Sequence, residues 1–161
     1  MDCDVVVVGC GPAGSTAAFF LASRNISTIC IERLNDDRFA RYHSICGECV
    51  SVKGSKTVGI KPNEIKNKIN EFRLDWPGGK ITRIKIDGLI IDRVKLLQRL
   101  RKESEEKGAR FIKSSVVEVK RIPNGFETIL RNGESIQSKY IIGADGAFSI
   151  VRKCLFDCRP E

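Results

Sequence analysis

The chain has 161 residues, of which 42% are hydrophobic and 30% charged, a balance that is typical of one globular domain and excludes a disordered chain. No apolar run reaches the ~18 residues of a membrane-spanning helix, and Asp2 and Asp4 stand where a signal peptide would be basic, so we expect a cytoplasmic protein. Lys and Arg outnumber Asp and Glu by 28 to 20, but they mostly alternate with acids, which argues against nucleic acid and favours an anionic ligand or a membrane surface.

The first elements predict a strand–turn–helix–strand unit. Residues 4–8 form an unbroken β-branched run, as in a parallel strand buried on both faces. Pro12 opens a helix over residues 12–24 with small and apolar residues at helical spacing. A second strand at residues 28–31 ends at Glu32.

The middle of the chain predicts a loop, a hairpin and a helix. Residues 33–56 are polar and small, which favours a loop. Strands at 72–76 and 81–86 are joined by a turn at Pro77, Gly78 and Gly79. Asp92 is the expected N-cap of a helix that runs to about residue 107, with Gly108 as its C′ residue and a strand at 110–112 after it.

The last third predicts a β-meander. Strands at 116–122 and 126–130 and a short third strand are separated by turns containing Asn-Gly pairs. An apolar strand at 140–142 leads into Gly143-Ala144-Asp145-Gly146 and a helix at about 147–153. The fold class is therefore α/β, with a parallel sheet that carries the βαβ unit and an inserted meander.

The turn at residues 9–14 has the spacing G-x-G-x-x-G. It follows a strand, opens a helix and is followed by the acidic Glu32 at the end of the second strand, which is the context of a dinucleotide-binding fingerprint. Gly9 and Gly11 let the backbone approach a pyrophosphate at the helix N-terminus, and Gly14 allows close packing of helix on strand. This motif alone leaves FAD and NAD(P) as alternatives.

The segment 143–152 reads G-A-D-G-x-x-S-x-V-R. Together with the glycine turn, it resembles the flavoprotein superfamily of p-hydroxybenzoate hydroxylase. The resemblance implies a Rossmann-like FAD-binding fold, with Asp145 and Gly146 near the flavin pyrophosphate.

A third motif is Cys46-Gly47-Glu48, followed by Cys49. With Ile90-Ile91-Asp92-Arg93 before a helix, it resembles the geranylgeranyl reductase branch of that superfamily. The branch implies reduction of isoprenoid double bonds in membrane lipid precursors by reduced FAD, with NAD(P)H or ferredoxin as electron donor and peripheral contact with the inner membrane face.

The resemblance also implies roles for single residues. Ala13 and Gly14 would face the pyrophosphate, Glu32 the adenosine ribose, and Cys46 and Gly47 the flavin. Arg33, next to Glu32, would also bind the cofactor. Arg93 would reach the cofactor phosphates and the backbone of Val117 the adenine. The catalytic group stays unknown, with Cys46 as the one candidate.

Cysteine and histidine chemistry offers weaker alternatives. Cys46 and Cys49 form a C-x-x-C motif, but the predicted loop around them has no helix N-terminus to lower a thiol pKa. A zinc site would also need Cys154 and Cys158, whose spacing differs from that of the first pair, so we expect no metal. Cys3, Cys10 and Cys30 are expected in the core. We expect His43, the only histidine, to face solvent or phosphate in a loop.

The resemblance covers nearly all 161 residues but only the first part of the family. We therefore expect a domain that is incomplete at its C-terminus, with substrate-subdomain strands beginning within residues 55–90 and a separately encoded C-terminal half as a partner. The alternatives are a flavin monooxygenase or halogenase relative, and a nucleotide-binding fragment without catalysis.

Overall fold

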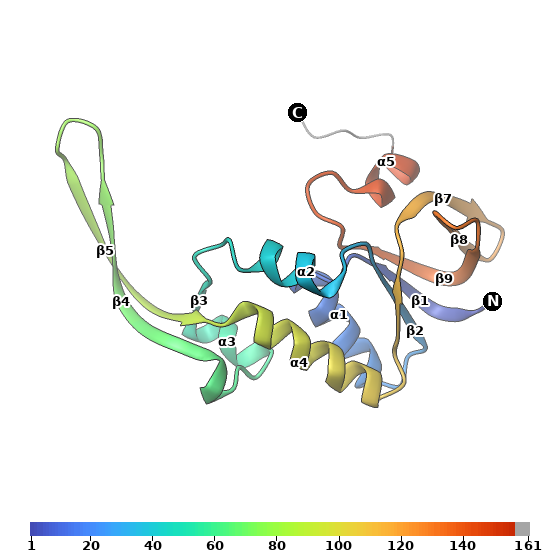
Figure 1. The fold of residues 1–161 in the computed structure, drawn as a ribbon, viewed down its shortest axis with the longest axis horizontal. Coiled ribbons are helices and arrows are strands. Elements are labelled where there is room, and N and C mark those ends of the chain that lie inside the picture. Colours follow the sequence, from blue (N-terminus) through green and yellow to red (C-terminus); the bar gives the residue numbers. More distant parts are fainter. Residues whose placement is uncertain (157–161) are drawn as a thin grey trace. The chain divides into compact units, whose positions relative to one another are not determined.

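The computed structural model describes residues 1–156 of the chain and divides them into two compact units (Figure 1). The sheet unit consists of residues 1–39 and the described residues from 97 onward. The hairpin unit consists of residues 40–96, and the insertion expected at 55–90 falls inside it. Each unit is described by itself.

The sheet unit contains six strands in the order β6-β2-β1-β9-β8-β7. β1 (Cys3–Val8) lies at the centre and pairs in parallel with both β2 (Thr28–Glu32) and β9 (Ser135–Gly143), and β2 pairs in parallel with β6 (Arg110–Lys113). β7 (Val116–Ile122), β8 (Gly125–Leu130) and the first half of β9 form the antiparallel meander. The predicted α/β fold with a βαβ unit and a meander is confirmed.

Both faces of β1 are buried, which explains its run of valines. Val5 and Val7 pack with Ala18 of α1 (Pro12–Ala22) on one face. Val6 and Val8 pack on the other face in a cluster that includes Val151 of α5 (Ile150–Phe156). A β-branched strand between two helical layers is the arrangement that parallel sheets require.

The hairpin unit contains a three-stranded antiparallel sheet in the order β3-β5-β4. Its elements are β3 (Cys49–Ser51), α3 (Val52–Thr57), the short 3-10 helix η1 (Pro62–Glu64), β4 (Ile65–Asp75) and β5 (Ile81–Ile91). β4 and β5 form a long hairpin that extends beyond β3 and α3 in Figure 1.

Two helices cross the boundary between the units. α2 (Asp36–His43) and α4 (Arg93–Glu106) each begin in one unit and end in the other. The predicted N-cap of α4 is confirmed, because the Asp92 carboxylate accepts a hydrogen bond from the amide of Lys95 at 3.0 Å. Gly108 has the positive φ of a C′ residue, at 92°.

The prediction of a loop over residues 33–56 is wrong. The side chain of Asn35 caps α2 by accepting from the amide of Arg38 at 2.9 Å, and Ser51 caps α3 by accepting from Gly54 at 2.9 Å. Small polar residues that are typical of loops are also the residues that begin helices, and here they do so twice.

Four predicted strands differ from the strands of the structure. β4 and β5 each have 11 residues, longer than the predicted 72–76 and 81–86. The separate strands expected after residue 133 and at 140–142 are one strand, β9, which pairs with β8 in its first half and β1 in its second.

The last helix begins at Ile150, later than residue 147. Among residues 1–156, no helix combines the length and hydropathy of a membrane span.

Candidate functional site

The glycine turn after β1 is sterically required to be glycine at two positions. Gly9 has a φ of 88°, and a Cβ there would lie 2.5 Å from the carbonyl oxygen of Ala144. A Cβ at Gly14 would lie 1.8 Å from the carbonyl oxygen of Gly9. Gly14 therefore lets α1 pack directly on the end of β1, as the fingerprint predicts.

The fold brings the first and second motifs together. β1 and β9 run in parallel with Val8 opposite Gly143, and the amide of Ala144 donates to the carbonyl of Val8 at 2.8 Å. The turn at Gly9 and the segment that contains Asp145 thus leave adjacent strands at the same edge of the sheet. In open α/β sheets this carboxyl edge is where nucleotides bind.

The N-terminus of α1 is suited to an anion. Gly11 is the N-cap residue, Pro12 occupies the first turn, and α1 has no acidic residue there and no side chain that caps it. The first amides of the helix therefore keep their hydrogen-bonding capacity and their partial positive charge. Ala13 is exposed on this first turn.

Glu32 connects the end of β2 to the glycine turn. Its Oε2 accepts from the amide of Cys10 at 2.8 Å and its Oε1 accepts from the amide of Leu34 at 2.9 Å. Each carboxylate oxygen can accept a second hydrogen bond, so the residue is oriented by the backbone while it remains able to receive hydroxyl donors.

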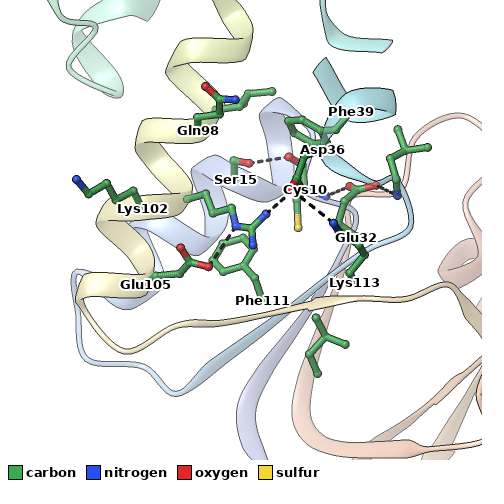
Figure 2. Close-up of a pocket in the computed structure, with 14 residues that line it drawn as sticks. Cys10, Ser15, Glu32, Asp36, Phe39, Gln98, Lys102, Glu105, Phe111 and Lys113 are labelled. Carbon is green, nitrogen blue, oxygen red and sulfur yellow. Dashed lines mark hydrogen bonds and ion pairs between the residues drawn. The ribbon is translucent and has the colours of Figure 1, made fainter. Parts of the chain in front are cut away.

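A pocket of about 340 Å³ opens beside Glu32 within the sheet unit (Figure 2). Its polar wall is an ion-pair chain in which Asp36 lies 3.6 Å from Lys113 and 3.7 Å from Arg101, and Arg101 lies over the ring of Phe111 at 5.1 Å. Cys10 and Glu32 form part of the lining, so a ligand in this pocket would meet the Glu32 carboxylate. Sequence reasoning missed the pocket because its lining comes from five separate segments.

Asp145 fixes the start of the last helix. Its Oδ2 accepts from the amide of Ile150 at 2.6 Å, and its buried Oδ1 has no partner among the described residues. Arg152, which the motif places seven residues later, donates to the carbonyl of Ala147, and its buried Nε has no partner there either. Asp145 therefore orients a backbone amide, and the motif leaves polar atoms for a ligand or solvent.

The predicted roles of Val117 and Arg33 in cofactor binding stay predictions. The register between β7 and β8 shifts at Val117, so the described ladder gives this residue no Cα partner in β8. A backbone released from the ladder in this way can bind a ligand. Arg33 is exposed directly after Glu32 and does not line the pocket.

In the hairpin unit, Glu48 organises the third motif. This residue is 9% exposed and has a φ of 56°, which is uncommon for a residue other than glycine. Its carboxylate accepts from the amide of Arg93 at 3.2 Å and from Nζ of Lys66 at 2.5 Å, while its carbonyl accepts from the amide of Ile91 at 3.0 Å. Glu48 therefore ties the Cys46-Gly47 loop to the start of α4.

Arg93 and Cys46 lie in the surroundings of Glu48. The Nε and Nη2 atoms of Arg93 are buried and have no partner among the described residues, which fits a site for an anionic group. Cys46 is exposed. A hydrogen bond from the backbone of Glu48 lowers the pKa of the Cys46 thiol, and the charge of Arg93 lowers it further. The thiolate is the reactive form of cysteine.

Three of the remaining cysteines and the histidine are buried, whereas Cys49 is exposed and Cys154 is partly buried. Cys3, Cys10 and Cys30 are buried, as predicted, and a hydrogen bond to the Cys30 thiol, together with burial, raises the pKa of Cys10. No metal-binding group occurs among the described residues, and Cys158 lies outside them. The prediction for His43 is wrong: it ends α2 and is buried, with its ring edge-on to Tyr42 at 5.1 Å.

Comparison with known proteins distinguishes FAD from NAD(P) as the dinucleotide of this chain. The model of the FAD binding domain family matches residues 2–157. This chain belongs to that family. FAD is therefore its cofactor. In the sheet unit, the glycine turn and Glu32 fit a nucleotide with a pyrophosphate. In the hairpin unit, the two donor atoms of Arg93 without a described partner fit an anionic group.

Relatives of this flavoprotein chain include named reductases. It is 31% identical to digeranylgeranylglycerophospholipid reductase 1 of Methanosphaera stadtmanae, over 94% of this chain and 40% of that protein. An uncharacterized protein of Methanosarcina barkeri is 30% identical over 93% of this chain and 86% of its own length. A geranylgeranyl bacteriochlorophyll reductase-like protein from Thermoplasma acidophilum matches 90% of this chain and 39% of its own, with a TM-score of 0.72 and 26% identity.

The chain thus spans about 40% of the length of the named reductase that it matches. The resemblance to the geranylgeranyl reductase family is confirmed, and the parent family consists of FAD-dependent oxidoreductases.

Proposed function

We propose that this chain provides the ADP-binding part of an FAD-dependent reductase that saturates isoprenoid double bonds of membrane lipid precursors. The observation that carries the proposal is that the glycine turn and the Asp145 segment meet at the carboxyl edge of the sheet, in a chain whose 31% identical relative is named for this reaction. The Cys46-Gly47-Glu48 motif and the buried donor atoms of Arg93 in the hairpin unit support it separately. Such a substrate is a lipid, so the proposal includes peripheral contact with the inner face of the membrane.

The proposal assigns a role to each of the site residues. The α1 amides after Gly11 bind the pyrophosphate, and Glu32 accepts hydrogen bonds from the ribose hydroxyls. Asp145 holds the amide of Ile150 in place at the same sheet edge. In the hairpin unit, Arg93 offers two unpaired donor atoms to phosphate oxygens.

When bound and reduced, FAD supplies the hydride for such a reduction. Cys46 is the candidate for a residue beside the flavin, and the lowered pKa of its thiol favours the thiolate form. NAD(P)H or ferredoxin would be the electron donor.

A second candidate is a flavin monooxygenase relative. PqsL of Pseudomonas aeruginosa, described as a probable FAD-dependent monooxygenase, has a TM-score of 0.75 over 99% of this chain, although at 15% identity the likeness shows the fold alone. The Cys46-Gly47-Glu48 loop and the named reductase relatives favour the reductase.

The experiment that tests the proposal is a titration of the purified chain with FAD and with ADP, followed by calorimetry and flavin fluorescence. We expect both ligands to bind, with ADP retaining most of the affinity. Glu32→Gln should weaken ADP binding about tenfold, or about 1.4 kcal/mol, because a neutral amide is a weaker acceptor for ribose hydroxyls.

A dideoxy analogue of ADP that lacks both ribose hydroxyls is the matched control. Glu32→Gln should weaken binding of this analogue less than it weakens binding of ADP, because the loss of one acceptor for the amides of Cys10 and Leu34 affects both ligands equally. The difference between the two losses measures the hydrogen bonds to the ribose hydroxyls. If neither FAD nor ADP binds the native chain, the proposal fails for this polypeptide.

A further inference from the structure

The basic side chains of this protein are commonly paired with acids. Along α4, Arg99 pairs with Glu103 at 3.1 Å and Arg101 pairs with Glu105 at 3.2 Å. The β4–β5 hairpin carries two further pairs of this kind. Paired charges largely cancel at a distance, so these elements attract an anionic partner only weakly.

The segment of residues 49–63 in the hairpin unit departs from this pattern. It contains Lys53, Lys56 and Lys61 and no Asp or Glu. All three lysines are exposed, and none of them forms an ion pair in the described part of the chain. We call these three residues the lysine surface. It supplies half of the net charge of +6 that the hairpin unit owes to its twelve Lys or Arg and six Asp or Glu.

The acids on either side of this segment are engaged below the surface. Glu48 is 9% exposed and Glu64 is 1% exposed. The carboxylate of Glu48 accepts from Nζ of Lys66 at 2.5 Å, and that of Glu64 accepts from the amide of Lys61 at 2.8 Å. Both flanking acids are therefore buried and hydrogen-bonded, and neither is available at the surface to neutralise the lysine ammonium groups.

The backbone holds the three lysines close to one helix, α3. Lys53 and Lys56 lie three residues apart in α3, which places them on the same face. The chain folds back after α3, because the amide of Ile60 donates to the carbonyl of Ser55 at 3.1 Å. Lys61 follows directly, next to the end of α3 that carries Lys56. The positive charge is thus gathered on one short element.

The residue types of this segment favour a lipid surface over a protein or a nucleic acid. Residues 49–63 contain no Arg, Met or aromatic residue. Protein interfaces are enriched in those residue types and depleted in Lys. Nucleic acids are bound by aromatic side chains that stack on bases and by Arg that contacts base edges. A lysine ammonium on a flexible stem instead suits diffuse attraction to anionic head groups.

We propose that the lysine surface holds the hairpin unit against an anionic membrane, through attraction between its three ammonium groups and lipid phosphates. The inference rests on the proposed function for the choice of a lipid surface, because a reductase of membrane lipid precursors meets its substrate there. Each basic residue near such a surface increases partitioning about fivefold, so the three together contribute roughly a hundredfold. None of the exposed large apolar side chains lies in this segment, so the contact is electrostatic and depends on salt.

Sedimentation of the full chain with lipid vesicles tests the proposal. We expect the chain to bind vesicles of equal parts phosphatidylglycerol and phosphatidylcholine at low salt. It should leave them at about 1 M salt, where the Debye length falls to about 3 Å, and should not bind vesicles of phosphatidylcholine alone. Acetylation of lysines followed by mass spectrometry locates the contact, because the anionic vesicles should protect the three members of the lysine surface.

Variants with matched charge separate this surface from the net charge of the chain. Lys56→Ser should lower partitioning onto the anionic vesicles about fivefold, and replacement of all three lysines by Ser should lower it roughly a hundredfold. Lys120→Ser is the control, because it removes the same charge from an exposed lysine of β7 that pairs with Glu118 at 3.2 Å. It should leave the partitioning nearly unchanged.

Four results would overturn the proposal. The first is equal sedimentation with the two kinds of vesicle. The second is an equal loss for Lys56→Ser and Lys120→Ser, which assigns the attraction to the net charge of the chain. The third is unchanged acetylation of the lysine surface on vesicles that bind the chain. The fourth is tighter binding to polyglutamate or single-stranded DNA at the same salt, which assigns the surface to an acidic polypeptide or a nucleic acid.

ADP titration of the same samples keeps the two proposals apart, because ADP binding depends on the sheet unit. Loss of ADP binding with vesicle binding intact would refute the ADP-binding role alone. Loss of vesicle binding with ADP binding intact would refute only the role of the lysine surface.

Discussion

The sheet unit and the hairpin unit hold their site residues by different physical means. In the sheet unit, backbone atoms lie so close to Gly9 and Gly14 that a Cβ atom at either position would clash with them. The neighbouring strand β1 is buried on both faces. In the hairpin unit, the Cys46-Gly47 loop is exposed and is held by the polar contacts of one residue, Glu48. Close packing enforces the first site, whereas a few hydrogen bonds position the second.

The two units also differ in net charge. Residues 40–96 contain twelve Lys or Arg and six Asp or Glu, so they carry +6 of the net charge of +8. The basic excess of the sequence is therefore concentrated in the unit that contains Arg93. This unit therefore supplies most of the net positive charge that attracts anionic groups.

The largest expected effect tests the packed site. Gly14→Val should lower the free energy of unfolding by more than about 3 kcal/mol and abolish ADP binding, because its Cβ would lie 1.8 Å from the Gly9 carbonyl. Chemical denaturation and calorimetry measure both. Gly47→Ala is the control, because its Cβ meets nothing within 4 Å, and it should change stability by less than about 0.5 kcal/mol. Equal effects of the two would remove the contrast between the units.

Glu48→Ala tests the hydrogen-bonded site. It should destabilise the hairpin unit by about 1–3 kcal/mol, because the amide of Arg93 and the ammonium of Lys66 lose a largely buried acceptor. Hydrogen exchange should rise within residues 40–96 and stay constant in β1 and β2. Glu48→Gln retains an acceptor and should lose less. Uniform acceleration across both units would contradict local anchoring by Glu48.

Thiol reactivity should separate the two units by rate. The lowered pKa of Cys46 increases its thiolate fraction at neutral pH, while the raised pKa and burial of Cys10 suppress the thiolate there. Mass spectrometry after brief iodoacetamide treatment should find Cys46 modified well before Cys10. Arg93→Gln should raise the pKa of Cys46 and move its alkylation profile to higher pH. An unchanged profile would mean that Arg93 does not act on the thiol.

The smallest expected effect concerns an exposed pair in the sheet unit. Asp4 lies 2.6 Å from Nζ of Lys139, and this hydrogen bond holds the pKa of Asp4 below its ordinary value. Its stabilising contribution is present above the unfolded-state pKa and is lost as pH falls through the lower folded-state value. Asp4→Asn should flatten the acid limb of the stability curve slightly and leave stability at pH 7 nearly unchanged. A large loss at pH 7 would show that packing, and not this pair, is affected.

Local patterns predicted the elements where one physical signal dominated. The valine run of β1, the Asp92 cap and Gly108 each specify a strand or a helix end through neighbouring residues alone. The stretch 33–56 was mispredicted because Asn35 and Ser51 favour loops and helix N-termini equally. Which of the two forms depends on contacts that the local sequence does not contain.

The sequence by itself determined the dinucleotide turn and its acidic partner, because the spacing of Gly9, Gly14 and Glu32 is set by local backbone geometry. Only the tertiary structure decided that Ala144 lies against Gly9, that His43 is buried and that a pocket opens beside Glu32. The exposed apolar side chains of Phe72, Leu74 and Ile84 also belong to this second group, since the register of β4 on β5 places them on one face. Pairing between distant segments depends on long-range packing, and packing is a property of the folded chain.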